Sequence, residues 1–92
     1  MPDDQYQFDQ RLVAEYLESV LAGDEVSATR IVDEIRSVGT PVDALYLGLF
    51  IPVQREIGLR WSRGEVAIAN EHMATEITAR LMDRLRDVGV RK

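Results

Sequence analysis

The sequence predicts an all-α domain, an antiparallel four-helix bundle. Apolar residues recur at three- and four-residue steps along most of the chain, which is the helical period. No segment alternates between polar and apolar residues for long enough to indicate a strand. Short turns with Gly or Pro separate four helical segments, and such short connections favour antiparallel packing. We therefore expect residues 1–92 to form one four-helix domain, frayed at residues 1 to about 6 and at the last three.

The first two helices are predicted at residues 7–22 and 25–38. Gly23 suits the position after a helix end, Asp24 suits the N-cap of the next helix, and Gly39 closes the second helix. The expected core positions of the first helix are Phe8, Leu12, Val13, Tyr16, Leu17, Val20 and Leu21. Those of the second helix are Ala28, Ile31, Val32, Ile35 and Val38.

The third helix has a strong start signal in the sequence Thr-Pro-Val-Asp. Thr40 is the expected N-cap, Pro41 fits the first helical position, and Asp43 follows at N3 as in a capping box. The helix is expected to extend to Arg60 or Trp61. Its core stripe is predicted to contain Val42, Leu45, Leu49, Val53, Ile57 and Trp61.

Pro52 interrupts the third helix because its nitrogen has no proton to donate to residue 48. A kink is therefore expected near Gly48 or Leu49. Gly64 ends this helix, and the fourth helix is predicted over residues 66–88. Its core stripe is predicted to contain Val66, Ala69, Met73, Ile77, Leu81, Leu85 and Val88, with Gly89 following the helix end.

Composition excludes several classes of function. The net charge of −5 argues against direct binding of nucleic acid, which requires a basic face. The basic residues near the C-terminus are interpreted as a solvated face. The absence of cysteine excludes disulfides and thiolate metal sites. The acidic, polar N-terminus does not fit a signal peptide, and no apolar run approaches the length of a membrane span, so a cytoplasmic location is expected.

The only tryptophan and the only histidine of the chain lie close together in sequence, at Trp61 and His72, around the turn between the third and fourth helices. Glu71 precedes the histidine. A helix end, a turn and a helix start can direct an indole and an imidazole toward the same space. From the residues alone, Trp61 also fits a core or lid-packing role and His72 a surface role.

The same residues do not indicate a catalytic or metal site. A zinc-binding helix of the His-Glu-x-x-His type needs a second histidine one turn after His72, where this chain has Glu76. Ser62 follows Trp61, but no His–acid relay points to it. No metal ligands and no catalytic residues are therefore predicted.

The third and fourth helices carry more apolar residues than one core stripe requires. The third helix has a second apolar side formed by Tyr46, Leu47, Phe50 and Ile51. On the fourth helix, Ile68 and His72 lie one turn apart and are offset from the core stripe. Such a widened face is expected where a helix contacts a partner as well as its own bundle. The candidates are a second copy of the chain, another domain or a large flat cofactor.

Residues 51–75 resemble the helical cap domain of cobalamin-binding proteins. That domain precedes a Rossmann-like B12-binding domain in cobalamin-dependent methionine synthase, in corrinoid methyltransferase proteins and in light-sensing MerR-type transcription regulators. The segment is most similar to the light-sensing branch, in which a Trp is followed by nine residues and then Glu-His, as in Trp61-x9-Glu71-His72. Further residues that fit the resemblance are Pro52, Ile57, Gly58, Gly64 and Glu65.

The resemblance implies an upper-face site for cobalamin, with adenosylcobalamin favoured over methylcobalamin. Trp61 would lie over the corrin against a 5′-deoxyadenosyl group, and Glu71 would accept hydrogen bonds from its hydroxyls. His72, Ile68 and Ile57 would line the same pocket.

Two departures limit what this chain is expected to do alone. The sequence has no Asp-x-His-x-x-Gly motif, which supplies the lower cobalt ligand from the Rossmann-like domain. Cobalamin binding should therefore be weak without such a domain in cis or in trans. Light-sensing relatives can also have a cobalt-capturing His after the Trp, where this chain has Ser62.

Three hypotheses follow. The chain is a cobalamin-binding cap or sensor module of a regulatory or photosensory protein, such as a transcription regulator. Alternatively, it is the cap, itself non-catalytic, of a corrinoid methyl-transfer protein. In the third hypothesis it is a helical bundle that self-associates, for example as a homodimer through its spare apolar face, and binds another tetrapyrrole or no cofactor.

Overall fold

The computed structural model describes the backbone of residues 8–90 and the side chains of residues 8–86, and this part of the chain forms four helices without strands. The third helix is divided in the middle by a π-helical turn. In chain order the elements are α1 (Gln10–Leu21), α2 (Glu25–Ser37), α3 (Val42–Leu45), η2 (Tyr46–Phe50), α4 (Ile51–Ser62) and α5 (Ile68–Val90). The predicted all-α four-helix bundle is confirmed.

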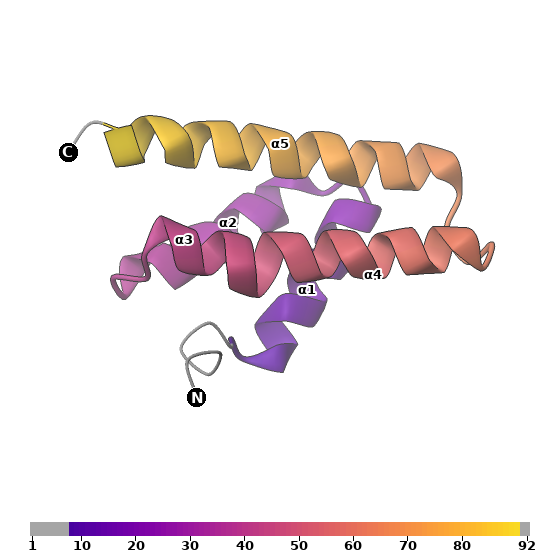
Figure 1. Ribbon diagram of the computed structural model, residues 1–92, viewed down its shortest axis with the longest axis horizontal. Helices are drawn as coiled ribbons and strands as arrows, with labels where there is room; N and C mark the ends of the chain where they lie inside the picture. The colour runs from indigo at the N-terminus through magenta and orange to yellow at the C-terminus, as the bar shows by residue number, and fades with distance from the viewer. Residues whose placement is uncertain (1–7, 91–92) are drawn as a thin grey trace.

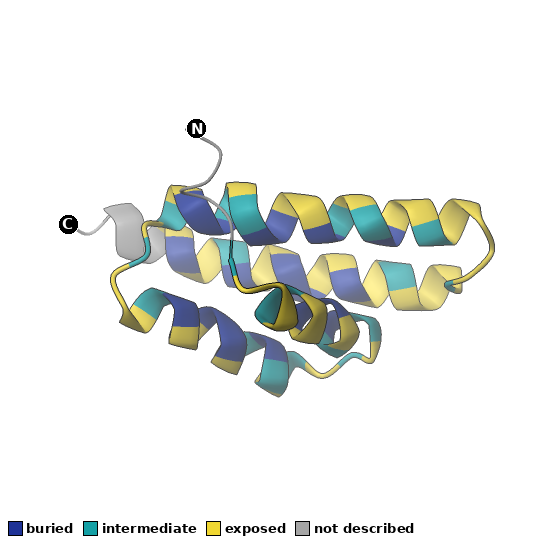
Figure 2. Ribbon diagram, turned by 90° about the horizontal axis from the view of Figure 1, so that it is seen from below, coloured by how far each residue is buried: buried dark blue, intermediate teal, exposed yellow. Residues whose placement is uncertain are grey.

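The two longest helical units lie side by side and run in opposite directions (Figure 1). One is the continuous helix α3–η2–α4 and the other is α5. Helix α1 crosses this pair and contacts α2, α4 and α5. Buried residues face the interior from every helix (Figure 2). No helix among the described residues combines the length and the apolarity needed to cross a membrane.

Aromatic residues from two helices form the centre of the core. The rings of Tyr16 and Phe50 lie 5.8 Å apart between centroids, and Tyr46 meets Phe50 edge-on at 5.6 Å. Tyr16 is fully buried, and its hydroxyl is hydrogen-bonded to Thr78 Oγ1 at 2.8 Å, which joins α1 to α5. Aliphatic side chains surround this cluster, among them Leu17, Val20, Ile31, Val32, Ile35, Leu45, Leu49, Val53, Ile57, Ile77 and Leu81.

Three of the predicted helix ends are confirmed at glycines with positive φ, namely Gly23, Gly39 and Gly64. At the end of α4, the N–H of Gly64 donates to the carbonyl of Trp61 (3.0 Å) and the N–H of Glu65 donates to that of Arg60 (2.8 Å). This pair of bonds is the Schellman motif, which a glycine in the left-handed conformation permits. The predicted N-cap of α2 is also confirmed, since the Asp24 carboxylate accepts from the N–H of Ser27.

Other predicted helix ends were wrong. Helix α1 begins at Gln10 rather than residue 7, because Asp9 caps it by accepting from the N–H of Arg11 (2.9 Å). Helix α5 begins at Ile68 rather than residue 66 and continues through the expected stop at Gly89 to Val90. The expected fraying at residues 1–6 lies outside the described residues, as do residues 91 and 92 of the last three.

The N-cap predicted at Thr40 was also wrong. Pro41 occupies the N-cap position, and no side chain caps this helix, which starts at Val42. The carbonyl of Thr40 instead accepts a hydrogen bond from Arg36 Nη1 (2.8 Å), which holds the turn against the end of α2.

The distortion expected near Pro52 takes the form of the π-helical turn η2. The N–H of Ile51 donates to the carbonyl of Tyr46, five residues earlier. This wider turn accommodates the missing N–H of Pro52 and adds one residue to the turn. Leu49 and Phe50, in this turn, are both fully buried.

Four residues of the predicted core stripes, Val38, Trp61, Ala69 and Met73, lie at the surface instead, and the side chain of Val88 lies outside the described residues. Val38 is 82% exposed because α2 ends at the preceding residue. Met73 and Trp61 are 42% and 48% exposed. On α5 the neighbouring Ala74 is buried instead of Met73, whose sulfur covers the place where a side chain at Gly23 would be.

Candidate functional site

Trp61 is presented to solvent from a fixed position at the end of α4. It lies in the last turn, and the Schellman motif bonds its carbonyl to the N–H of Gly64. The preceding residue, Arg60, is bonded to Glu56 Oε2 (2.9 Å) and pairs with Glu18 of α1 (3.9 Å). The hydrogen bond that Arg60 donates to Glu56 raises the pKa of Arg60 above its ordinary value. These contacts hold the helix end while half of the Trp61 side chain remains exposed.

The start of α5 is tied to the turn between α1 and α2. Asn70 Nδ2 donates to the carbonyl of Leu21 (3.1 Å), and Met73 lies against Gly23. Because Gly23 has a φ of +73° and no side chain, Met73 can pack directly on the backbone of the turn. The first turns of α5 are therefore positioned by α1 as well as by α4.

Ion pairs hold α5 against α2 farther along the helix. Arg80 binds both carboxylate oxygens of Glu25, at 2.8 and 3.0 Å. The hydrogen bond with Arg80 lowers the pKa of Glu25, and the same bond raises the pKa of Arg80. Arg84 pairs with Asp33 one turn later, at 3.8 Å.

The relative register of α4 and α5 follows from one contact between them. Gln54 Nε2 donates to Thr75 Oγ1 at 3.2 Å. Because the two helices are antiparallel, Gly58 lies at the level of Glu71, and Trp61 lies at the level of Ile68. Gly58, Trp61, Ile68, Glu71 and His72 thus occupy one stretch of the seam between the helices, which we call the α4–α5 face.

Four of the five site residues proposed from the sequence lie on this face, and the fifth does not. Ile68 is 65% exposed, Glu71 is partly buried, and the His72 imidazole is largely exposed. Its Nε2 lies 3.2 Å from Glu76 Oε2. Ile57 is fully buried in the core, so its side chain can support the face only from beneath.

Gly58 is the residue of the α4–α5 face that has no side chain. An added Cβ at this residue would meet no atom within 4 Å, so the bundle itself does not require a glycine here. Glycine inside a helix costs about 1 kcal/mol relative to alanine. Glycine at this position therefore leaves space on the α4–α5 face. The packing of the bundle does not explain why the helix carries its cost in stability.

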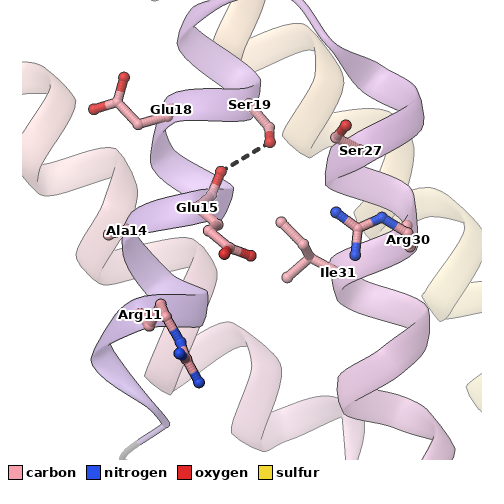
Figure 3. Close-up of a pocket in the computed structure, with 8 residues that line it drawn as sticks. All are labelled: Arg11, Ala14, Glu15, Glu18, Ser19, Ser27, Arg30 and Ile31. Carbon is pink, nitrogen blue, oxygen red and sulfur yellow. Dashed lines mark hydrogen bonds between the residues drawn. The ribbon is translucent and has the colours of Figure 1, made fainter.

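Three hollows of the described surface lie away from the α4–α5 face. The hollow between α1 and α2 is lined by arginines, glutamates, serines and aliphatic residues, without an aromatic ring (Figure 3). Two others lie between α2 and α5 and between α1 and α4. None of these three is lined by Trp61, Glu71 or His72. Within the described residues, no three His, Cys, Asp or Glu side chains gather to hold a metal ion.

Sequence reasoning missed two polar residues that adjoin the face. Thr75 follows Glu71 by one helical turn, and this four-residue spacing was the available signal. Its hydroxyl donates toward the carbonyl of Glu71 (3.0 Å) and toward Glu71 Oε2 (3.3 Å). Gln54 lies 21 residues from Thr75 in sequence, so its part in the site depends on the register between helices, which no local pattern reveals.

A family model described as "B12 binding domain" matches residues 12–86. The chain belongs to this family of B12 binding domains. The matched range extends from α1 into α5 and includes all four helices, so the whole bundle corresponds to a helical cap domain. Comparisons with curated proteins and with solved structures gave no match.

Proposed function

We propose that this domain covers the upper face of an adenosylcobalamin-type cofactor in a regulatory or photosensory protein. The proposal rests mainly on the α4–α5 face, where a half-exposed Trp61 follows Gly58 by about one turn of α4 and Glu71 lies at the level of Gly58 on α5. The family match supports cobalamin as the ligand, and the spacing of Trp61 and Glu71-His72 supports the adenosyl form.

The residues present fit such a cofactor. The Trp61 ring offers a flat apolar surface of the kind that stacks on a nucleoside base. Glu71 offers carboxylate oxygens, which are suitable acceptors for ribose hydroxyls. Gly58 permits a flat group to approach the backbone of α4 between them. When bound, adenosylcobalamin supplies a cobalt–carbon bond, and the residues of this chain orient the upper ligand and exclude water from it.

A partner is needed because the α4–α5 face is one-sided. Trp61, Ile68 and His72 are exposed, so the described residues leave the opposite side of a bound ring uncovered. We propose a Rossmann-like B12-binding domain as this partner, in cis or in trans. Ser62 provides no imidazole for cobalt, and its hydroxyl donates to the carbonyl of Leu59 within its own helix.

A second candidate function is association of two copies. Leu47 and Ile51 remain half-exposed on the same unit as Trp61, and Ile68 extends the apolar surface onto α5. These residues would be buried in a homodimer that needs no cofactor. A cap of a corrinoid methyl-transfer protein is a further alternative, and it predicts a preference for methylcobalamin.

Cofactor titration tests these proposals. The protein, alone and with a Rossmann-like B12-binding domain, is titrated in the dark with adenosylcobalamin and with methylcobalamin, and binding is followed by calorimetry. We expect weak binding to the isolated chain, tighter binding with the partner domain, and a lower Kd for the adenosyl form. Preference for methylcobalamin would favour the methyl-transfer alternative. No binding in either setting, together with a dimer in sedimentation, would favour the self-associating bundle.

Gly58→Ala should separate stability from cofactor affinity. Alanine at this open helix position is expected to stabilise the free bundle by up to about 1 kcal/mol. The added methyl group is expected to weaken adenosylcobalamin binding several-fold, because it occupies the approach to α4. Urea unfolding and calorimetry measure the two effects.

Val26→Ala provides the matched control for this change. Val26 is highly exposed on α2, away from the α4–α5 face, and alanine there raises helix propensity as well. It should stabilise the bundle without changing the cofactor Kd. Unchanged affinity in Gly58→Ala would contradict the close approach to Gly58.

A further inference from the structure

We infer that Thr75 and Gln54 are positioning residues that orient the Glu71 carboxylate for its ligand. This inference rests on the proposed function, in which Glu71 accepts hydrogen bonds from the cofactor's nucleoside. It adds residues from both sides of the α4–α5 seam to a site otherwise defined by Trp61 and the Glu71-His72 pair.

The hydrogen bonds of Gln54, Thr75 and Glu71 form a chain in which Gln54 donates to Thr75 and Thr75 donates to Glu71. Gln54 Nε2 donates to Thr75 Oγ1 at 3.2 Å, which occupies a lone pair of that hydroxyl. The hydroxyl must then use its single proton elsewhere. Both acceptors within its reach belong to Glu71, the main-chain carbonyl at 3.0 Å and Oε2 at 3.3 Å. Donation from Gln54 polarises the hydroxyl toward Glu71.

The Gln54 amide makes its hydrogen bond through the nitrogen and leaves the oxygen without a partner. Its Oε1 is buried and has no hydrogen-bond partner, whereas its Nε2 is directed to Thr75. A buried acceptor without a partner is unfavourable and calls for an explanation. The bond from Nε2 to Thr75 is the one polar contact of the Gln54 side chain among the described residues. That bond fixes the amide.

The geometry leaves Glu71 available for a ligand. Only one of its oxygens faces Thr75, and that contact is long for a hydrogen bond to a carboxylate. Oε1 makes no hydrogen bond with another described residue. Thr75 therefore restrains the rotation of the carboxylate from one side and leaves the other oxygen free to accept from a nucleoside hydroxyl.

The test compares two cofactors in Thr75→Val, which has nearly the same shape but no hydroxyl. The protein with its Rossmann-like partner domain is titrated with adenosylcobalamin and methylcobalamin, and the ratio of the two Kd values is measured. We expect Thr75→Val to reduce the preference for the adenosyl form about 3- to 10-fold, with little change for methylcobalamin, whose upper ligand is a methyl group without a ribose. Thr75→Ser should restore the wild-type ratio, and Gln54→Met should give a partial loss.

Glu71→Gln separates a failure of this inference from a failure of the proposed function. If Glu71→Gln lowers the preference and Thr75→Val does not, Glu71 binds the nucleoside without help from Thr75, and the inference is overturned alone. If the wild-type protein has no preference for the adenosyl form, the proposed function and the inference fail together. Equal weakening of both cofactors in Thr75→Val would indicate a general structural effect and would also overturn the inference.

Discussion

Trp61→Ala is expected to weaken adenosylcobalamin binding about 10- to 100-fold in the protein with its Rossmann-like partner domain. Stacking of an aromatic side chain on a base contributes about 1–3 kcal/mol by alanine substitution, and each 1.4 kcal/mol changes Kd tenfold. The indole is half-exposed before the ligand binds, so its burial by the cofactor adds apolar area to the complex. Calorimetric titration of both proteins measures the change.

Leu59→Ala is the matched control for Trp61→Ala. Leu59 is 50% exposed, compared with 48% for Trp61, and it lies two residues earlier in the same helix. Residues two apart face different sides of a helix, so Leu59 lies away from the α4–α5 face. We expect both variants to remain folded and only Trp61→Ala to lose affinity. Equal Kd values for Trp61→Ala and the wild type would remove the indole from the site.

Local sequence patterns predicted the fold because its helices begin and end at local signals. Gly23, Gly39 and Gly64 permit the left-handed backbone at three helix ends, and Asp24 caps α2 through a residue three positions away. Such signals need no knowledge of tertiary structure. Thr40 is not the cap because α3 starts at Val42, which places Pro41 at the N-cap position.

Helical periodicity was less informative at the ends of the core stripes. Four residues fit an apolar period and are nevertheless exposed. Val38 follows the end of α2, Trp61 lies in the last turn of α4, and Ala69 and Met73 lie in the first two turns of α5. The exposure of Trp61 matters for the proposed site, because a large apolar side chain exposed at a restrained helix end is available to a ligand. Periodicity gives the direction of a side chain around its helix and says nothing about what covers it.

The candidate site was predicted only in part for a related reason. Trp61 and the Glu71-His72 pair were recognisable from residue type and spacing. Ile57 was placed in the site from the resemblance, yet it follows the core period and is fully buried. Gln54 joins the site through an antiparallel register that depends on the packing of α4 against α5.

Raising the pH from 10 to 12 should destabilise the bundle through Tyr16. Burial raises the pKa of the Tyr16 phenol to about 12, against an ordinary value of 10.0, and the hydrogen bond with Thr78 offsets this rise only in part. Below pH 10 the phenol is protonated in both the folded and the unfolded chain, and no stability is lost. Between pH 10 and 12 only the unfolded chain releases the proton, so unfolding becomes more favourable by about 1.4 kcal/mol per pH unit. The total loss is about 2–3 kcal/mol.

Tyr16→Phe should remove this contribution. At pH 8 the variant is expected to be less stable by about 1–2 kcal/mol, because Thr78 Oγ1 loses its partner in the core. At higher pH the difference from the wild type should shrink, since phenylalanine does not ionise. Urea unfolding at pH 8, 10 and 11.5 measures the difference in free energy of unfolding between the variant and the wild type. Tyr46→Phe is the control for a partly buried tyrosine. A constant difference across these pH values would show that the Tyr16 phenol does not titrate in this window.

The same substitution tests how α5 is held beneath the α4–α5 face. Thr78, which bonds Tyr16, is three residues from Thr75, so the Tyr16–Thr78 bond fixes α5 against α1 close to the residues that orient Glu71. If this bond sets the position of α5, Tyr16→Phe should also weaken cofactor binding at neutral pH, although Tyr16 is fully buried and cannot contact a ligand. An unchanged Kd would mean that the contacts of Asn70 with Leu21 and of Arg80 with Glu25 suffice to hold α5 in register.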